Sequence, residues 1–396
     1  MSHPVLKLPH ADGRLAPYTL RAPATWPSST ARPQWNRVAF AAAHVVAAPL
    51  AQVDPWHDAA IDWDATLAYR RYLWSLGFGV AEAMDTAQRG MGLDWSNSLT
   101  LIRRTVAEAA AIPGAVVFSG AGTDHLAPDP AAPLSRIVGA YEEQCAAIEA
   151  VGGRIILMAS RALAACAKSS DDYAHVYGRV LSQVRAPVIL HWLGEMFDPA
   201  LAGYWIGADG RDPDHARAID VCANVIGANA AKIDGIKVSL LDDAKEIALR
   251  RCLPSGVRMY TGDDFNFAAL IGGDATGHSD ALLGIFDAIA PAASVALTAL
   301  AEGERAKFYA ILEPTISLSR HIFAAPTRYY KTGVVFMAWL NGHQSHFTLI
   351  GGQQSARSLV HLAELFRLAD AAGLLRDPDL AAKRMRTLLA LHGIDG

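Results

Sequence analysis

Short apolar segments alternate with longer amphipathic segments along most of the chain. Eight of the apolar segments have the length and the Val and Ile content of strands that are buried on both faces. The predicted strands are residues 38–46, 79–83, 115–119, 154–158, 187–191, 233–238, 257–261 and 281–286. Strands that alternate with helices in this way predict a parallel sheet, because each return to the sheet needs a crossover helix.

Helical periodicity separates the strands and dominates the last quarter of the chain. Segments with this periodicity include residues 101–111, 134–151, 171–184, 214–227 and most of 291–389. An open dinucleotide-binding sheet would place a glycine-rich turn after its first strand, yet that segment reads AFAAAHVVAAPLA, without GxGxxG or GxxxxGK[ST]. We therefore predict an α/β protein with a closed (β/α)₈ TIM barrel.

The chain divides into three predicted regions without a linker between them. Residues 1–36 are rich in Pro, Ser, Thr and Arg and are expected to form an irregular N-terminal extension. Residues 37–300 should form the barrel, and residues 301–396 a C-terminal helical region packed on it. A barrel with such extensions accommodates the 396 residues of the chain, since TIM barrels range from about 200 to more than 400 residues.

Composition and charge narrow the class of protein. The chain is 52% hydrophobic and 19% charged, with a net charge of −4 and no basic stripe, which argues against nucleic-acid binding. No segment reaches the ~20 apolar residues of a membrane span, and no signal peptide is evident. The four cysteines form no CxxC pair and indicate reduced thiols. We expect a cytoplasmic protein that acts on a small molecule and forms a homo-oligomer.

The segment DGIKVS, residues 234–239, carries the strongest chemical signal. Its Lys237 stands near the carboxyl end of an apolar strand, where TIM barrels place their active sites. Burial lowers the pKa of an amine, and a neutral amine can attack a carbonyl to form an imine. The alternative is a lysine that pairs with an interior carboxylate and only supports the barrel.

The preceding strand ends in PVILHWLGE, residues 187–195, and brings a histidine close to Lys237. Neighbouring strands lie about 4.8 Å apart, so His191 should stand beside the lysine. A histidine there can move protons at neutral pH, although a hydrogen-bonded structural histidine fits the position equally well. Glu195 follows in the loop as a weaker candidate for an acid or base.

Other strand ends contribute polar or glycine-rich segments to the same rim. These segments are EAMDTAQRG (82–90), FSGAGTDH (118–125), MASRAL (158–163) and YTGDDFN (260–266). Each is also typical of an ordinary surface loop or helix start. The candidate substrate-binding residues that they supply are Asp85, Thr86, Gly120, Ser160, Arg161, Gly262 and Asp263.

Five of these motifs, in their order, resemble the superfamily of dihydrodipicolinate synthase and N-acetylneuraminate lyase, which are lysine-dependent aldolases. The motifs are GIKVS, PVILHW, SGAGT, YTGDD and the helix PTRYYKTGVVFMAWLNG, residues 326–342. The resemblance spans residues 37–375. More narrowly, the chain resembles an uncharacterised branch that is described only as dihydrodipicolinate synthase-like.

The resemblance implies a class I lyase, with Lys237 as the imine-forming residue and no metal or cofactor. His191 stands where the superfamily has a catalytic tyrosine, and Asp85 and Thr86 stand near its paired threonines, which hold the substrate carboxylate. Asp85 would repel a carboxylate at close range. The expected substrate is therefore a hydroxylated keto acid or an oxidised sugar derivative rather than pyruvate, cleaved, condensed or dehydrated through the imine.

Two alternatives remain open from the sequence. A metal-dependent isomerase, epimerase or class II aldolase would use oxygen and imidazole ligands for a divalent ion. The candidate ligands are Glu82, Asp85, His125, His191 and Asp263. The second alternative is a barrel without catalytic activity that binds a metabolite.

Overall fold

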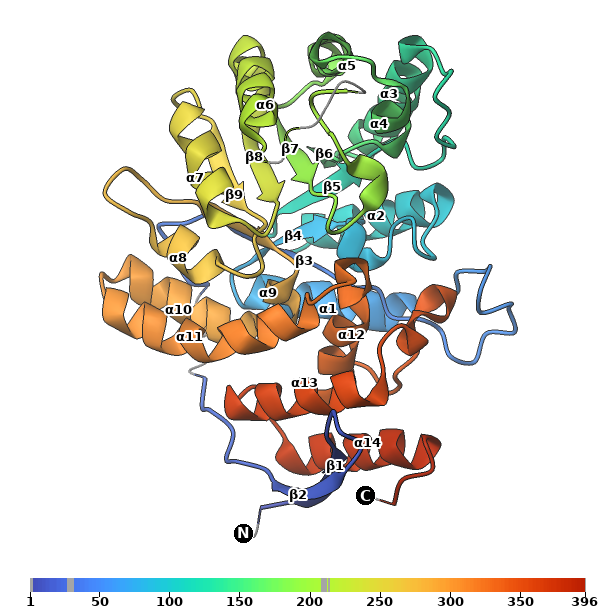
Figure 1. Cartoon of the computed structure of the whole chain (residues 1–396), viewed down its shortest axis with the longest axis vertical. Helices are drawn as coiled ribbons and strands as arrows, with labels where there is room; N and C mark the ends of the chain where they lie inside the picture. The colour runs from blue at the N-terminus through green and yellow to red at the C-terminus, as the bar shows by residue number, and fades with distance from the viewer. Residues whose placement is uncertain (1–2, 27–31, 208–211, 213, 396) are drawn as a thin grey trace.

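The computed structural model describes residues 3–26, 32–207, 212 and 214–395 (Figure 1). Within them, eight parallel strands form a closed barrel in chain order, and the last strand pairs with the first. The barrel strands are β3 (Ala39–Ala42), β4 (Gly79–Glu82), β5 (Val117–Ala121), β6 (Arg154–Leu157), β7 (Val188–Leu193), β8 (Ile233–Ser239), β9 (Arg258–Thr261) and β10 (Asp280–Leu283). The predicted TIM barrel is confirmed.

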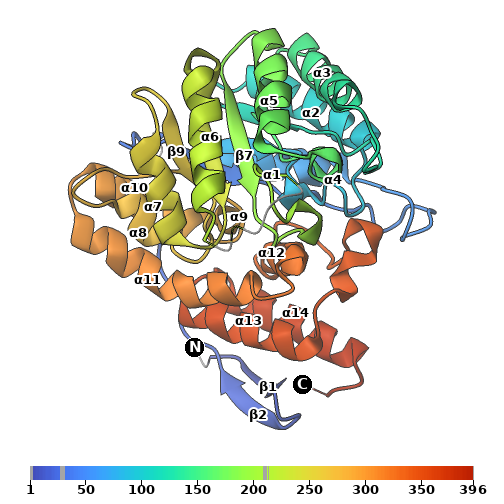
Figure 2. The same ribbon diagram turned by 45° about the horizontal axis from the view of Figure 1, so that its top comes forward.

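Helices surround the barrel and cover the outer faces of its strands (Figures 1 and 2). Those up to the end of the barrel region are α1 (Trp63–Ser75), α2 (Trp95–Ala110), α3 (Leu134–Ala150), α4 (Arg161–Cys166), α5 (Ser170–Gln183), α6 (Ala216–Ala228), α7 (Asp243–Cys252), α8 (Phe267–Gly272), α9 (Ile285–Ala288), α10 (Ala290–Ala301) and α11 (Arg305–Ile322). Short 3₁₀ helices η1 (Asp85–Ala87), η2 (Pro199–Leu201) and η3 (Ala230–Lys232) interrupt the loops. None of these helices, nor any other in the described residues, has the length and apolar character of a membrane span.

The extra C-terminal helices lie against one side of the barrel. They are α12 (Tyr330–Leu340), α13 (Leu359–Ala371) and α14 (Pro378–Leu391), with η4 (Thr327–Tyr329) and η5 (Ile350–Ser355) beside α12. Every residue of α12 is buried, which explains its nearly continuous apolar sequence. Because α12 contacts η1 and α9, its first turn reaches the rim formed by the loops after β4 and β10.

The N-terminal extension differs from the irregular segment that we expected. Its described part contains an antiparallel hairpin of β1 (Val5–Pro9) and β2 (Leu15–Thr19) that packs on α13 and α14 (Figure 2). Leu6 and Leu8 are buried while Lys7 is exposed, the alternation of a strand with one covered face. Residues 1–2, 27–31 and 396 of the predicted terminal regions lie outside the described residues.

Some strand bounds also differ from the prediction. The first barrel strand ends at Ala42 rather than at residue 46, and the segment that follows it carries His44 into a buried contact with Asp287. The last strand ends at Leu283, since residues 285–288 turn into α9. Apolar sequence continues through both transitions, so hydrophobicity alone did not mark where the strands stop.

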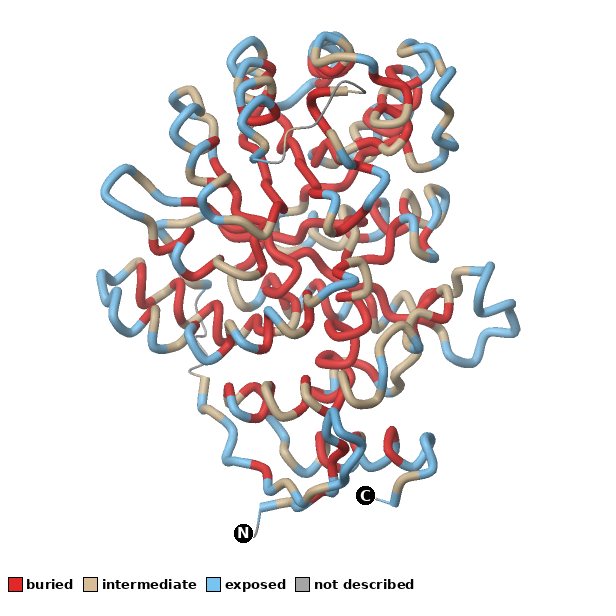
Figure 3. The backbone as a smooth tube through the Cα atoms, viewed as in Figure 1, coloured by how far each residue is buried: buried red, intermediate tan, exposed pale blue. Residues whose placement is uncertain are grey.

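The barrel interior is apolar at the amino ends of its strands and polar at the carboxyl ends. Phe40 packs against Phe118 and Tyr260, with ring centroids 5.3 and 6.0 Å apart. Figure 3 shows this central region as almost entirely buried. The interior positions nearer the carboxyl ends include His191 and Lys237. The chemistry-bearing side chains thus gather at the end where TIM barrels bind ligands.

Candidate active site

Lys237 lies in the barrel wall with its amine in a confined position. It pairs in register with His191 on β7 and with Tyr260 on β9. The residue is only 7% exposed, and a Cβ on Gly262 would approach its Cε to 2.7 Å. Glycine at 262 therefore makes room for the lysine side chain. The structure gives Gly262 a packing role beside the lysine, which does not test the prediction that it binds substrate.

Burial lowers the pKa of Lys237 below the ordinary value of a lysine, and the charges of Asp264 and Asp85 oppose that shift. No carboxylate of the described residues lies within ion-pair distance of its Nζ, unlike the lysines that pair with acids on the surface. An amine without a fixed partner can lose its proton more readily than a paired one. Lys237 thus meets the physical requirement for a nucleophilic amine.

His191 is buried next to Lys237 and has an unoccupied ring nitrogen. Its Nε2 lies 3.3 Å from Ser239 Oγ, while Nδ1 has no hydrogen-bond partner in the described part of the chain. Burial, and then the charge of Lys237, lower the pKa of His191 well below the ordinary value. A neutral imidazole results, which can accept a proton from a bound molecule.

The Gly-Asp-Asp segment after β9 gives its two carboxylates different tasks. Asp263 accepts hydrogen bonds from the N–H groups of Phe265 and Asn266, at 2.8 and 3.0 Å, and so holds the turn. Asp264, which we did not single out from the sequence, interacts with the charge of Lys237 and accepts a hydrogen bond from the N–H of Ile285 at 2.8 Å. Burial raises the pKa of Asp264 to about 7.

A cavity of about 130 Å³ opens above His191 at the mouth of the barrel. The residues that line it include Asp85, Thr123, Asp124, Met158, Arg161 and His191. Lys237 is not part of this lining, but it pairs in register with His191, which is. The volume is small compared with the ~300–1,000 Å³ of drug-sized ligand sites. It suits a compact metabolite.

The loop after β4 separates the two predicted carboxylate-site residues. Asp85 faces the cavity, and in the described residues its carboxylate has no ion pair. Thr86 is buried, and its Oγ1 lies 2.8 Å from the hydroxyl of Tyr330 at the start of α12. Thr86 thus anchors the loop to the C-terminal helices, whereas Asp85 lines the cavity.

Three further predicted residues lie at neighbouring strand ends. Ser160 caps α4 by accepting the Leu163 N–H at 2.9 Å, and its hydroxyl lies 2.6 Å from that of Thr123. The Gly120 carbonyl accepts a hydrogen bond from Arg89, so both residues support the loops. Arg161 pairs with Asp198 through Nε and also lines the cavity. Of the three, only Arg161 lines the cavity.

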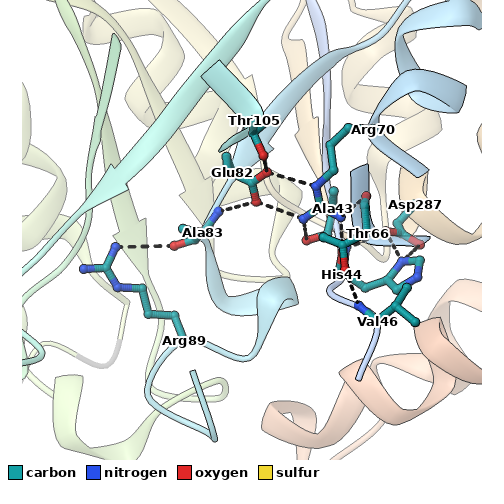
Figure 4. Close-up of polar contacts among 10 residues, drawn as sticks. All are labelled: Ala43, His44, Val46, Thr66, Arg70, Glu82, Ala83, Arg89, Thr105 and Asp287. Carbon is teal, nitrogen blue, oxygen red and sulfur yellow. Dashed lines mark hydrogen bonds and ion pairs between the residues drawn. The ribbon is translucent and has the colours of Figure 1, made fainter. Parts of the chain in front are cut away.

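The proposed metal ligands do not come together. Glu82 points away from the mouth and is bound by Arg70, Thr105 and the Ala83 N–H (Figure 4). His125 does not line the cavity, and its Nδ1 lies 2.8 Å from Gln144 Nε2. Throughout the described ranges, no three His, Cys, Asp or Glu side chains are grouped as a metal site would require. The geometry therefore gives the metal-dependent alternative no support.

The first turn of α12 adds residues that the sequence did not lead us to assign. Tyr330 contacts Thr86 through its hydroxyl. Lys331 is buried in a small recess that shares Asp85 with the cavity, and the charge of Asp85 acts on its amine. A lysine inside the apolar stretch YYKTGVVFMAWL was the available signal. Its neighbours Met91 and Asp85 could not be identified, because they lie more than 200 residues away in the chain.

Together, the fold and this mouth define a TIM barrel whose sixth strand carries a buried lysine with no ion pair among the described residues. The chain belongs to the family described as "Protein of unknown function (DUF993)", whose profile matches residues 6–394. The comparison with curated proteins gave no significant match.

Solved structures with a similar fold share 12–14% sequence identity with this chain. The dihydrodipicolinate synthase of Aquifex aeolicus has 12% identity and a TM-score of 0.59, over 91% of this chain and 99% of that one. YagE of Escherichia coli K12 is a dihydrodipicolinic acid synthase family protein in complex with pyruvate. It has 14% identity and a TM-score of 0.62, over 91% of this chain and 99% of that one. A dihydrodipicolinate synthase of Bacillus anthracis has 14% identity and a TM-score of 0.59, over 83% of this chain and 97% of that one. At such identities the likeness shows the fold.

Proposed function

We propose that the chain is a class I lyase that forms an imine between Lys237 and a small hydroxylated carbonyl compound. The observation that carries the proposal is the unpaired, buried amine of Lys237 directly beside a neutral His191. The resemblance of the strand motifs to lysine-dependent aldolases, and the shared fold, support the same class. Asp85 in the cavity favours a substrate with hydroxyl groups over pyruvate, whose carboxylate it would repel.

The proposed reaction begins when the lone pair of Lys237 Nζ attacks the substrate carbonyl carbon. The carbonyl oxygen takes up protons and leaves as water, which gives the protonated imine. In the cleavage direction, His191 accepts the proton of the β-hydroxyl, whose O–H electron pair becomes the second C–O bond of an aldehyde that leaves. The electron pair of the breaking C–C bond moves into the imine to form an enamine. His191 then returns the proton to the enamine carbon, and water hydrolyses the imine to release the ketone and the free lysine.

The same imine also permits loss of a β-hydroxyl as water, after removal of an α-proton, and it permits C–C bond formation in the reverse direction. All three reactions need an electron sink at the carbonyl carbon and a base within reach. Which of them the protein performs depends on where the substrate places its hydroxyl relative to His191.

The test is reduction with borohydride in the presence of a panel of keto acids and keto sugars, followed by intact-protein and peptide mass spectrometry. We expect one covalent adduct, located on Lys237, in the wild type and in Lys307→Met, which removes an exposed surface lysine. Lys237→Met should lose the adduct and at least ~10³-fold in turnover, because it has no amine to form the intermediate. An adduct or turnover that persists in Lys237→Met would exclude the proposed chemistry.

A thermal measurement on the same variant separates loss of chemistry from loss of structure. Methionine retains most of the volume of the lysine stem and removes an amine that is costly to bury. The melting temperature of Lys237→Met should therefore equal or exceed that of the wild type.

A further inference from the structure

A small recess adjoins the main cavity on the side of the C-terminal helices. Its lining includes three cationic residues, Arg161, Arg328 and Lys331, and two carboxylates, Asp85 and Asp198. The recess has a volume of about 10 Å³ and shares Asp85, Arg161 and Asp198 with the cavity above His191. Since that volume holds about one water-sized atom, a ligand in the cavity can place a terminal oxygen in the recess.

The cations of the recess are only partly paired. Lys331 is 5% exposed, and its Nζ donates to the Arg328 carbonyl at 3.0 Å and lies 3.1 Å from Met91 Sδ. Neither partner is an anion, and in the described residues no carboxylate lies within ion-pair distance of Lys331. The Nε of Arg328 is buried and also lacks a partner there. Of the three cations, Arg161 alone has a carboxylate within ion-pair distance in the described part of the chain, that of Asp198.

The charges that line the recess do not balance. Three cations against two carboxylates leave one positive charge in excess within a largely buried space. Burial, which Asp85 opposes, and the charges of Arg328 and Arg161 together lower the pKa of Lys331 to about 8. The ammonium still predominates at neutral pH. An anion placed among these groups would relieve their mutual repulsion.

We propose that the recess binds a carboxylate of the substrate, at a distance from the carbonyl carbon that Lys237 attacks. One net positive charge matches a monoanion better than a phosphate dianion, and a planar carboxylate is the smaller group for so small a space. Arginine forks bind carboxylates through paired hydrogen bonds, which Arg161 and Arg328 can supply. The assignment rests on the proposed function only for the position of the carbonyl.

The position of Asp85 defines the substrate class further. Its charge acts on both Lys237 and Lys331, so it lies within electrostatic range of both ends of the proposed substrate. A carboxylate accepts hydrogen bonds and therefore fits a hydroxyl group. The substrate class is a keto acid with at least one hydroxyl-bearing carbon between the ketone and the carboxylate. In an α-keto acid such as pyruvate, the two groups are bonded directly and cannot occupy both sites.

Binding of gluconate tests the recess independently of the imine, because gluconate has hydroxyls and a carboxylate but no ketone. We expect calorimetry to show binding to the wild type, to Lys237→Met and to the surface variant Lys307→Met. Lys331→Met and Arg328→Gln should each bind about tenfold or more weakly, since a charged hydrogen bond contributes about 1.5–3 kcal/mol. Arg328 is only half-buried, so its variant should fold even if Lys331→Met does not.

A charge-preserving variant and a second ligand sharpen the result. Lys331→Arg should retain gluconate binding at pH 9, where the lysine of the wild type has lost its proton and binding weakens. Inorganic phosphate should bind more weakly than gluconate. The proposal is overturned if the wild type does not bind gluconate, if Lys331→Met and Arg328→Gln bind it as the wild type does, or if phosphate binds more tightly. Failure of borohydride trapping with intact gluconate binding would instead reject the lyase chemistry and leave the recess in place.

Discussion

Two acidic residues three positions apart, Glu82 and Asp85, belong to regions that treat buried charge in opposite ways. Glu82 ends β4 on its outer face, where Arg70 binds both carboxylate oxygens at 2.9 Å (Figure 4). Thr105 and the Ala83 N–H complete its hydrogen bonds at 2.6 and 2.8 Å. Asp85 turns to the mouth, where its neighbours Lys237 and Lys331 have no ion pair in the described structure.

The comparison distinguishes buried charges that are paired within the fold from polar groups at the mouth that lack a protein partner in the described residues. Arg70 and Glu82 are fully buried, and each finds protein partners for its polar atoms. At the mouth, His191 Nδ1 has no partner among the described residues. The amine of Lys237 has no carboxylate within ion-pair distance there. Buried polar groups are usually satisfied, so an unsatisfied set in one cavity indicates where a bound molecule completes the network.

The largest effect that this comparison predicts is on stability, in Arg70→Met. Removal of one partner leaves Glu82 buried without its counter-charge, which should cost about 3–5 kcal/mol of the free energy of unfolding. Urea denaturation measures the loss. The neighbouring Arg71, which pairs with Glu108 at 2.6 Å on the surface, supplies the control. Arg71→Met should change stability by about 1 kcal/mol or less. Equal losses in the two variants would remove the distinction between the regions.

A smaller effect, on catalysis alone, is expected for His191→Asn. The imidazole accepts no structurally required hydrogen bond at Nδ1, so unfolding free energy should change little. Turnover should fall by about 10²-fold, as is usual when a general base is removed. Borohydride trapping on Lys237 should persist, because imine formation does not require His191. His175→Asn, on the exposed face of α5, serves as the control. Unchanged turnover in His191→Asn would show that another group moves the proton.

Much of this arrangement was predictable from the sequence. All eight barrel strands followed from short apolar runs, and their order placed His191 next to Lys237, as the register confirms. The N-terminal hairpin was missed although the alternation of Leu6, Lys7 and Leu8 indicated a strand. Local patterns therefore sufficed for the barrel and for the pairing of its two central residues.

The remaining features depend on contacts that no local pattern encodes. Glu82 and Asp85 looked equivalent at the end of β4, and only the position of Arg70 in α1 decides which of them is paired. Asp263 and Asp264 are adjacent, and the turn geometry assigns one to the loop and the other to Lys237. Lys331 reaches the mouth because α12 packs against η1 and α9, which are long-range contacts of the tertiary structure.

The smallest predicted effect concerns Glu246 of α7. The hydrogen bonding of its carboxyl group is intermediate between that of Glu82 and that of the groups at the mouth. Its Oε1 accepts the Ser279 hydroxyl at 2.6 Å, while Oε2 has no partner among the described residues. Burial raises the pKa of Glu246 from 4.5 to about 8, and hydrogen bonding by Ser279 opposes the shift. The folded protein therefore holds this proton at neutral pH.

A pH series of melting temperatures tests that protonation in Glu246→Gln. Because the folded pKa lies above the unfolded one, the stability that the neutral carboxyl contributes is complete below pH 4.5 and is lost as the pH rises through about 8. Glutamine does not ionise, so the variant should not lose this stability as the pH rises. At pH 8 it should melt above the wild type, by about 2–4 °C for each kcal/mol of stability that the wild type has lost. Glu302→Gln on the surface should follow the wild type. If the wild-type and Glu246→Gln curves run parallel from pH 5 to pH 8, Glu246 is already ionised in the folded protein. It would then belong with the paired charges behind β4.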